Sequence, residues 1–202
     1  MKIRITFKKT GVMRYISHLD LQRAFTRALV RSGLDITYSE GFNPHPKIAF
    51  AIPLSMYQES VCEVVDFGVN AEIPTGEVVS ALSRALPRGI EITGCFYPTN
   101  KISDVVSADY DITLHTDRSA DEISKLMQGR LVTIKSGKKG DVEVDITDKI
   151  FCFECLEKDG GGVLLKVRVS AAPDAVLNPA LICKAIGEED NDIVRTAINF
   201  KN

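Results

Sequence analysis

The sequence contains no apolar run approaching the roughly 18 residues of a membrane-spanning helix, so no membrane contact is expected. Its first residues, MKIRITFKKTG, alternate charged and apolar side chains and lack the apolar block of a signal peptide. Five cysteines, an odd number without the spacing of a disulfide framework, fit a reducing compartment better than a secreted scaffold. These absences favour a cytoplasmic location.

Motifs of common cofactor-binding and hydrolytic enzymes are also missing. The sequence has no P-loop, no GxGxxG and no GxSxG. Cys152 and Cys155 are spaced like half of a zinc ribbon, but FCFECL reads as a strand, in which residues three apart point to opposite faces. No group of three cysteines is available for an iron–sulfur cluster. We therefore expect this chain to bind no cofactor and no metal.

The charge of the chain is unevenly distributed. With 45% hydrophobic and 26% charged residues, the 202-residue chain has the composition of a globular protein. Its net charge of −2 hides a first quarter, residues 1–50, in which nine Lys and Arg face three acids. That segment is +6 and the remainder −8, which suggests that the first quarter faces a polyanion such as nucleic acid or a phosphorylated ligand. Mutual neutralisation of the two parts in the fold is equally open.

Apolar periodicity and chain breakers predict the order β-α-β-β-α-β for residues 1–98. The best-marked element is a helix over residues 17–32, because Ser17 and Asp20 form a capping signal and Gly33 supplies the stop. The segment 35–38 is extended, and either this segment or 48–54 is the second strand. The other expected elements are strands at 2–8, 61–69 and 90–97 and a helix at 74–86.

Residues 100–202 repeat this order with extra strands. We expect a helix at 119–128, a helix at 179–186, and a hairpin of 150–157 with 163–170 whose turn is rich in glycine. The remaining strands are expected at 108–115, 131–135, 142–145 and 193–200. The fold class is therefore α+β. We predict two fused ferredoxin-like (βαββαβ) units, with helices packed on one face of each antiparallel sheet. The first unit is residues 1–99 and contains the basic segment 14–47. The second unit is residues 100–202 and contains a β-hairpin insertion.

The segment 14–47 holds most of the candidate functional residues. Its helix carries an arginine stripe opposite the apolar face, and its loop 39–47 is too polar and too rich in proline to be core. If 35–38 is the second strand, the loop returns to residues 9–18 and completes one anion-binding site; otherwise the convergence weakens. The candidate anion- or RNA-binding residues are Lys8, Lys9, Arg14, Tyr15, Ser17, Arg23, Arg27, Arg31, Ser39, Phe42, Asn43 and Lys47.

His18 and His45 are the candidate catalytic residues, since imidazole titrates near neutrality. The alternative is a structural histidine in the first helical turn and a loop histidine bonded to the backbone. A metal site of His18, Asp20, Glu40 and His45 has suitable ligand types but no recognised spacing. The arginine stripe also reads as a solvated face. Phe42 either stacks on a base or anchors its loop in the core.

Two long blocks, RYISHLDLQRAFTRAL and YSEGFNPHPKIAFAIPL, resemble an uncharacterised bacterial family, the radical-SAM-associated (radical-SAM-linked) proteins. The resemblance covers nearly the whole chain. It implies a radical SAM enzyme as partner, which would itself carry the iron–sulfur cluster and S-adenosylmethionine. A looser likeness, at the level of fold, is to RNA-processing proteins of CRISPR systems. The family signature falls here on Arg14, Tyr15, Ser17, His18, Leu19, Asp20, Tyr38, Ser39, Gly41, Phe42, Asn43, Pro44, His45, Pro46 and Lys47.

Three functions are compatible with these features. We expect first a non-catalytic accessory protein that binds RNA, such as tRNA undergoing modification, or another anionic substrate for a radical SAM enzyme. The second is an enzyme that processes RNA or a small molecule with His18 and His45. The third is a scaffold that docks the radical SAM enzyme through an apolar patch around Phe42.

Overall fold

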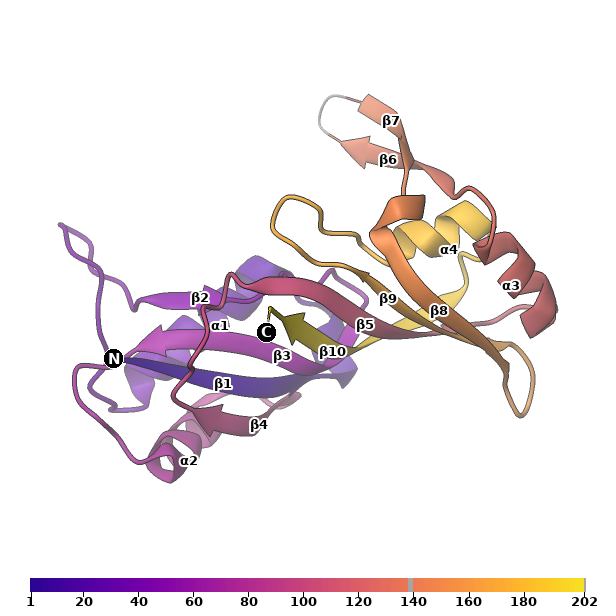
Figure 1. Ribbon diagram of the computed structural model, residues 1–202. Coiled ribbons are helices and arrows are strands. Elements are labelled where there is room, and N and C mark those ends of the chain that lie inside the picture. Colours follow the sequence, from indigo (N-terminus) through magenta and orange to yellow (C-terminus); the bar gives the residue numbers. More distant parts are fainter. Residues whose placement is uncertain (138–139, 202) are drawn as a thin grey trace. The chain divides into compact units, whose positions relative to one another are not determined.

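The computed structural model describes residues 1–137 and 140–201, which divide into two compact units, Met1–Val105 and Val106–Asn202. In chain order, the elements of the first unit are β1 (Lys2–Lys9), the 3-10 helix η1 (Gly11–Tyr15), α1 (His18–Arg31), β2 (Ile48–Phe50), β3 (Glu59–Gly68), α2 (Thr75–Ala85) and β4 (Ile90–Phe96) (Figure 1). The strands lie in the order β4-β1-β3-β2, and each strand is antiparallel to its neighbours in this order. The predicted helices 17–32 and 74–86 are confirmed to within one residue at each end.

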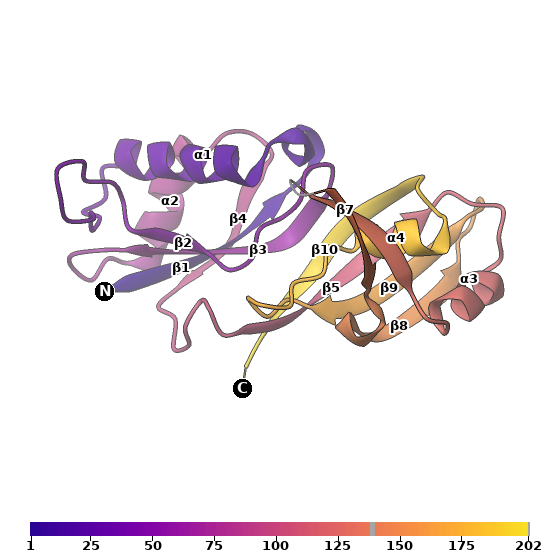
Figure 2. The same cartoon turned by 90° about the horizontal axis from the view of Figure 1, so that it is seen from above.

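Both helices of this unit cover the same face of its sheet (Figure 2). Ile3, Ile5 and Phe7 alternate along β1 toward that face and are fully buried. They pack against the apolar stripes of α1 and α2, whose periodicity places these side chains on one side of each helix. The buried residues that the two helices supply are Leu21, Phe25, Ala28, Leu29, Val78, Ala81 and Leu82.

The second strand differs from the longer prediction. Only Ile48–Phe50 pairs as a strand, and the segment 35–38 makes isolated bridges, Ile36 with Val69 and Tyr38 with Pro46. Gly68 allows this segment to approach β3, because a Cβ there would lie 2.8 Å from Thr37 Cβ. The second strand therefore comes from the segment 48–54, and the segment 35–38 is not a strand.

The polar face of β1 carries a buried ion pair. The guanidinium of Arg4 donates to both carboxylate oxygens of Asp66 on β3, at 2.6 and 2.9 Å. It donates as well to the side chain of Asn100, at 2.5 Å. Arg4 and Asp66 are both almost completely buried, although the alternation of β1 places Arg4 on its polar side. The bidentate geometry satisfies two charges that would otherwise be costly to bury.

The second unit has a four-stranded sheet and a separate hairpin. Its elements are β5 (Val105–Leu114), α3 (Ala120–Met127), β6 (Val132–Gly137), β7 (Gly140–Asp145), η2 (Thr147–Lys149), β8 (Ile150–Glu157), β9 (Val163–Ser170), α4 (Ala180–Ile186) and β10 (Asn191–Phe200). The sheet order is β10-β5-β9-β8, whereas β6 and β7 form a two-stranded sheet that projects from it (Figure 1). The predicted β8–β9 hairpin is confirmed with its predicted bounds. Among the described residues, no helix has the length and apolarity to span a membrane.

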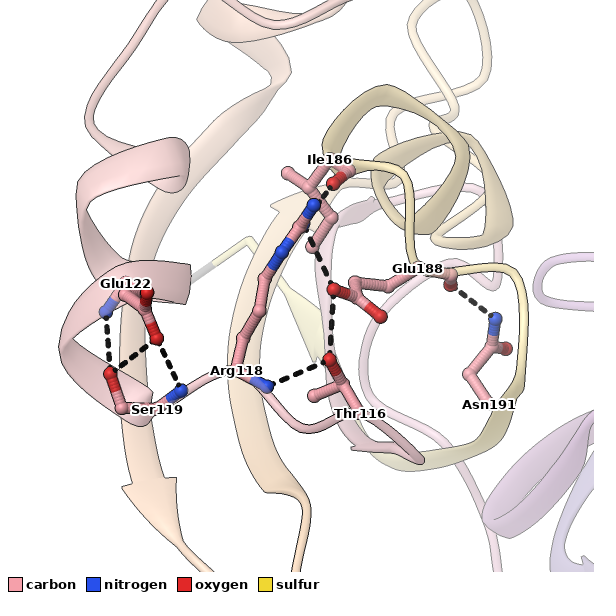
Figure 3. Close-up of polar contacts among 7 residues, drawn as sticks. All are labelled: Thr116, Arg118, Ser119, Glu122, Ile186, Glu188 and Asn191. Carbon is pink, nitrogen blue, oxygen red and sulfur yellow. Dashed lines mark hydrogen bonds and ion pairs between the residues drawn. The ribbon is translucent and has the colours of Figure 1, made fainter.

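A polar cluster fixes the loop that precedes α3 to the end of α4 (Figure 3). Glu188, which is nearly buried, accepts a hydrogen bond from Thr116 (3.0 Å) and forms an ion pair with Arg118 (2.9 Å). Arg118 also donates to the carbonyl of Ile186 (2.9 Å), so one guanidinium satisfies a helix-end carbonyl and a carboxylate. The neighbouring Ser119 caps α3. This cluster is structural, since each charge in it already has a partner.

Candidate functional site

The start of α1 positions the first group of candidate residues. Ser17 Oγ accepts a hydrogen bond from the Asp20 N–H (3.1 Å), and the Ser17 hydroxyl donates to the Asp20 carboxylate (2.7 Å). This is the predicted cap, so the Ser17 side chain is already engaged within the helix. The hydrogen bond from Ser17, followed by that from Arg23, lowers the pKa of Asp20.

His18 is tied to its own helix and to the sheet. Its ring stands edge-on to Phe50, with 5.3 Å between the ring centroids. Its Nε2 lies 3.1 Å from Nε2 of Gln22, one turn along α1. This contact joins the His18 ring to the Gln22 side chain on the same face of the helix. His18 thus orients the amide of Gln22.

The loop 39–47 is closed by hydrogen bonds between its own ends. Ser39 N–H donates to the carbonyl of His45 (2.8 Å), and His45 N–H donates to Ser39 Oγ (3.1 Å). Nδ1 of the exposed His45 ring lies 3.0 Å from Ser39 Oγ and 3.3 Å from the carbonyl of Asn43. Nδ1 is therefore the ring nitrogen engaged within the loop, and Nε2 is the nitrogen presented outside this network.

Phe42 lies at the tip of this loop and is fully exposed. Gly41, directly before it, has a φ of +114°, a conformation that side chains other than glycine rarely adopt. Of the two readings of Phe42, the structure has the exposed ring and not the core anchor.

A hollow of about 840 Å³ lies beside this loop in the first unit. Gln22 and Thr26 of α1 form one wall, and His45 and Lys47 of the loop form another. Its other lining residues are Met1, Lys2, Thr37, Pro46, Ile48, Ala49, Asp66, Phe67 and Gly68. The hollow therefore combines apolar surface with lysine, histidine, amide and hydroxyl groups, which is typical of sites for small polar molecules.

The candidate residues fall into two groups, at opposite ends of β1. The loop lies beside the start of β1, where Gly68 N–H donates to the Lys47 carbonyl and Gly68 pairs with Lys2. Arg14 and Tyr15 follow the end of the same strand. Eight residues of strand span about 25 Å, so one compact site of all the candidates does not form. Figure 2 shows the α1–β2 loop at one end of this unit and the segment before α1 at the other.

The predicted arginine stripe lies on the exposed face of α1. Arg23 forms an ion pair with Asp20 (3.0 Å), and Arg31 donates to the carbonyl of Ala85 (2.8 Å). Arg27 lies between them and makes no hydrogen bond or ion pair with any residue that the structure describes. Of the three guanidinium groups, that of Arg27 is the one most available to an anion.

An exposed aromatic pair, Tyr15 with Tyr57, lies next to the start of α1. The two rings are 57% and 62% exposed and meet edge to face, with 5.9 Å between centroids. The guanidinium of Arg14 lies 5.9 Å from the centre of the Tyr15 ring. Tyr57 has a φ of +67°, which is unusual for a bulky residue. Tyr57 was not among the predicted residues, because contacts across the fold, with no local motif, set this conformation.

The two adjacent lysines of β1 have different environments. Lys8 is partly exposed and forms an ion pair with Glu91 (3.2 Å). Lys9, which was predicted to bind an anion, is 1% exposed, and its ammonium group donates to the carbonyl of Gln58 (3.4 Å). It is thus a buried residue and adds no charge to the surface.

The described residues do not gather metal-binding side chains. Within them, no three His, Cys, Asp or Glu side chains lie together, and the set of His18, Asp20, Glu40 and His45 is no exception. All five cysteines are free, and burial raises the pKa of the Cys183 thiol to about 12. That thiol is therefore protonated at neutral pH and is a packing group.

Comparison with known proteins gives a family and a fold. The profile of a family of uncharacterized proteins conserved in bacteria matches residues 2–179. No curated protein matches the chain.

Two solved complexes contain chains of similar fold. One is the archaeal box H/ACA sRNP Nop10–Cbf5 complex, with a TM-score of 0.50 and 15% identity over 99% of this chain and 49% of that chain. The other is an H/ACA RNP bound to a substrate RNA containing 2′-deoxyuridine, with a TM-score of 0.50 and 13% identity over 97% of this chain and 47% of that chain. The chain thus spans about half the length of the solved chains it matches. At such identities the likeness shows the fold alone.

Proposed function

Starting from the fact that the chain belongs to an uncharacterized bacterial family (DUF2344), we propose that it is an RNA-binding accessory protein. The RNA is a single-stranded segment, and a tRNA loop is the candidate we favour. The RNA contacts the Tyr15–Tyr57 pair and the exposed arginine face of α1. The protein itself performs no chemical step; it presents the RNA to a partner enzyme, for which we propose a radical SAM enzyme.

The observation that carries this proposal is the exposed aromatic pair. Tyr57 has a left-handed backbone conformation, which costs roughly 1–3 kcal/mol of strain. Burial of its side chain does not compensate this strain, because the ring is 62% exposed. Unpaired bases stack on exposed aromatic rings, and a nearby arginine adds a cation–π contribution. Tyr15, Tyr57 and Arg14 provide both groups.

The charge of the first unit supports RNA over an uncharged partner. Residues 1–50 contain nine Lys and Arg, of which Arg4 and Lys9 are buried, and Arg23, Arg27 and Arg31 extend along the exposed face of α1 away from the aromatic pair. A 14-residue helix is about 21 Å long, enough to follow several phosphates of an extended strand. Lysine and arginine side chains that neutralise phosphates give affinity without sequence preference.

The fold is compatible with this proposal and does not by itself establish it. We interpret each unit as ferredoxin-like, because β4-β1-β3-β2 and β10-β5-β9-β8 repeat one strand order and β6–β7 is an added hairpin. One of the solved complexes with a similar chain holds a substrate RNA. Function nevertheless depends on the residues of a site rather than on the fold that carries it.

The test is RNA binding by fluorescence anisotropy at two salt concentrations, with a fluorescent single-stranded oligonucleotide and with unmodified tRNA. We expect saturable binding that weakens as salt rises, and an affinity that falls about tenfold or more in the Tyr15→Ala/Tyr57→Ala double variant. The conservative Tyr15→Phe/Tyr57→Phe variant keeps both rings and should bind like the wild type. Equal binding by the alanine and phenylalanine variants would remove the aromatic pair from the site.

A further inference from the structure

The hollow beside the loop 39–47 is a second site, separate from the Tyr15–Tyr57 pair. It lies at the other end of β1, and none of its lining residues belongs to that pair. We propose that this hollow binds a phosphate monoester carried on a nucleoside-sized body, with Lys2 and Lys47 as its charge partners.

The charges of the lining favour an anion. Lys2 and Lys47 are exposed, and neither forms an ion pair with the residues that the structure describes. The only carboxylate of the lining belongs to Asp66, which Arg4 already holds in a bidentate pair. The two lysines therefore keep a charge of +2 that nothing in the lining offsets. A phosphate monoester, which carries about −1.5 to −2 at neutral pH, matches this charge.

The volume and the remaining lining residues favour a larger molecule over a free inorganic ion. A hollow of about 840 Å³ is in the range of sites that enclose a whole small ligand. Pro46 and Phe67 are buried residues of the lining and supply apolar surface. Gln22, whose amide is oriented by His18, and Thr26 supply hydrogen-bonding groups along the wall formed by α1.

His45 adds a directional group to the same hollow. Its Nδ1 is committed to Ser39 and Asn43, so Nε2 is the nitrogen that meets a ligand. The ring is fixed by the loop closure and needs little reordering on binding. His45 is therefore placed as a ligand-contacting residue, and its role here needs no second histidine.

The test is calorimetric titration of the full chain with adenosine 5′-monophosphate, adenosine and inorganic phosphate. We expect the monophosphate to bind at one site, and adenosine to bind at least about tenfold more weakly because it lacks the charged group. Lys47→Glu should lower the affinity for the monophosphate about tenfold or more. Lys101→Glu is a matched change at an exposed lysine of the same unit outside the hollow, and it should leave the affinity for the monophosphate unchanged.

The phosphate can belong to a free nucleotide or to the end of an RNA strand. A 5′-phosphorylated oligonucleotide that binds more tightly than its 5′-hydroxyl counterpart, with the difference lost in Lys47→Glu, indicates the strand end. Binding of the mononucleotide without such a difference indicates a free nucleotide. No saturable binding of the mononucleotide at millimolar concentration, or equal affinity in wild type and Lys47→Glu, would overturn the proposal. The Tyr15→Ala/Tyr57→Ala variant distinguishes the two sites, because it should lose affinity for RNA and bind the mononucleotide as tightly as the wild type.

Discussion

Arg14 and Tyr57 are joined by two hydrogen bonds, one between their main chains and one from the Arg14 side chain. Tyr57 N–H donates to the carbonyl of Arg14 (2.8 Å), and Arg14 Nε donates to the carbonyl of Tyr57 (3.2 Å). These two hydrogen bonds keep Tyr57 at a φ of +67°. A conformation of this kind persists only where surrounding contacts determine it, and such positions concentrate at functional sites.

Replacing Tyr57 with glycine should separate stability from binding. Glycine adopts positive φ without steric strain, so the variant no longer carries the backbone strain of roughly 1–3 kcal/mol. This gain offsets the greater conformational entropy that glycine loses on folding, about 0.5–1 kcal/mol. We expect the free energy of unfolding, measured with urea, to be unchanged or to increase by about 1 kcal/mol. RNA affinity should fall by roughly 5- to 100-fold, the contribution of one stacked base. A variant that loses stability and keeps its RNA affinity would show that the ring is structural.

Charge reversal at Arg27 should weaken RNA binding without a change in stability. Its side chain is exposed and makes no hydrogen bond or ion pair with the described part of the chain. Arg27→Glu should lower RNA affinity severalfold and reduce the dependence of the logarithm of affinity on the logarithm of salt concentration by about one. Arg84→Glu, at an exposed arginine of α2, is the matched control. Equal losses in the two variants would indicate a general charge effect rather than contact with α1.

Elements whose ends are encoded locally could be predicted from the sequence. The start of α1 depends on Ser17 and Asp20, three residues apart, and the β8–β9 turn depends on consecutive glycines with positive φ. Both signals act within a few residues, so no knowledge of the rest of the fold is needed to interpret them. The predicted and observed bounds agree for this reason.

Features that depend on distant contacts could not be predicted. Lys9 and Arg4 lie in a strand whose alternation assigns Arg4 to a polar face, yet both are buried by residues far along the chain. The position of the loop 39–47 depended on which segment became the second strand, and the sequence pattern left both 35–38 and 48–54 open. Tyr57 has no local motif, because hydrogen bonds to Arg14, 43 residues earlier, set its backbone.

The buried pair of Arg4 and Asp66 should be essential to the first unit. Asp66→Ala leaves the guanidinium of Arg4 almost fully buried with Asn100 as its remaining partner among these contacts. Such an uncompensated charge typically costs about 3–5 kcal/mol of unfolding free energy. Glu91→Ala, which breaks the exposed pair with Lys8, should cost less than about 1 kcal/mol. Urea unfolding of both variants measures the contrast, and similar losses would contradict the assignment of Arg4 and Asp66 to the interior.

Loss of Arg118 should destabilise the second unit through Glu188 (Figure 3). Arg118→Ala removes the ion-pair partner of the Glu188 carboxylate and the hydrogen-bond donor to the Ile186 carbonyl, both at 2.9 Å. We expect a loss of about 1–3 kcal/mol, since a nearly buried carboxylate keeps only Thr116 as a donor among the contacts seen here. The Arg118→Ala/Glu188→Gln variant should recover part of this loss. If the double variant is no more stable than Arg118→Ala, the buried carboxylate is not the source of the effect.

The pair of Asp109 and Arg168 should make the second unit sensitive to acid. These residues face each other across β5 and β9, and Arg168 donates to both carboxylate oxygens at 2.6 and 2.8 Å. The hydrogen bond from Arg168 lowers the pKa of Asp109 below its ordinary value. Because the folded pKa is depressed, the stabilisation is present above the unfolded pKa of about 3.9 and is lost as the pH falls through the folded value.

The measurement is the difference in unfolding free energy between wild type and Asp109→Asn as a function of pH. At neutral pH the asparagine variant lacks the charged pair and should be the less stable protein. Below about pH 4 the wild-type carboxyl becomes protonated more readily in the unfolded than in the folded chain, so the difference should shrink as the pH falls. Thr113, on the same strand and close to Lys158 (3.3 Å), offers an uncharged control, since Thr113→Val should change stability equally at every pH. A difference for Asp109→Asn that stays constant from neutral to acidic pH would mean that the pair with Arg168 contributes no net electrostatic stabilisation.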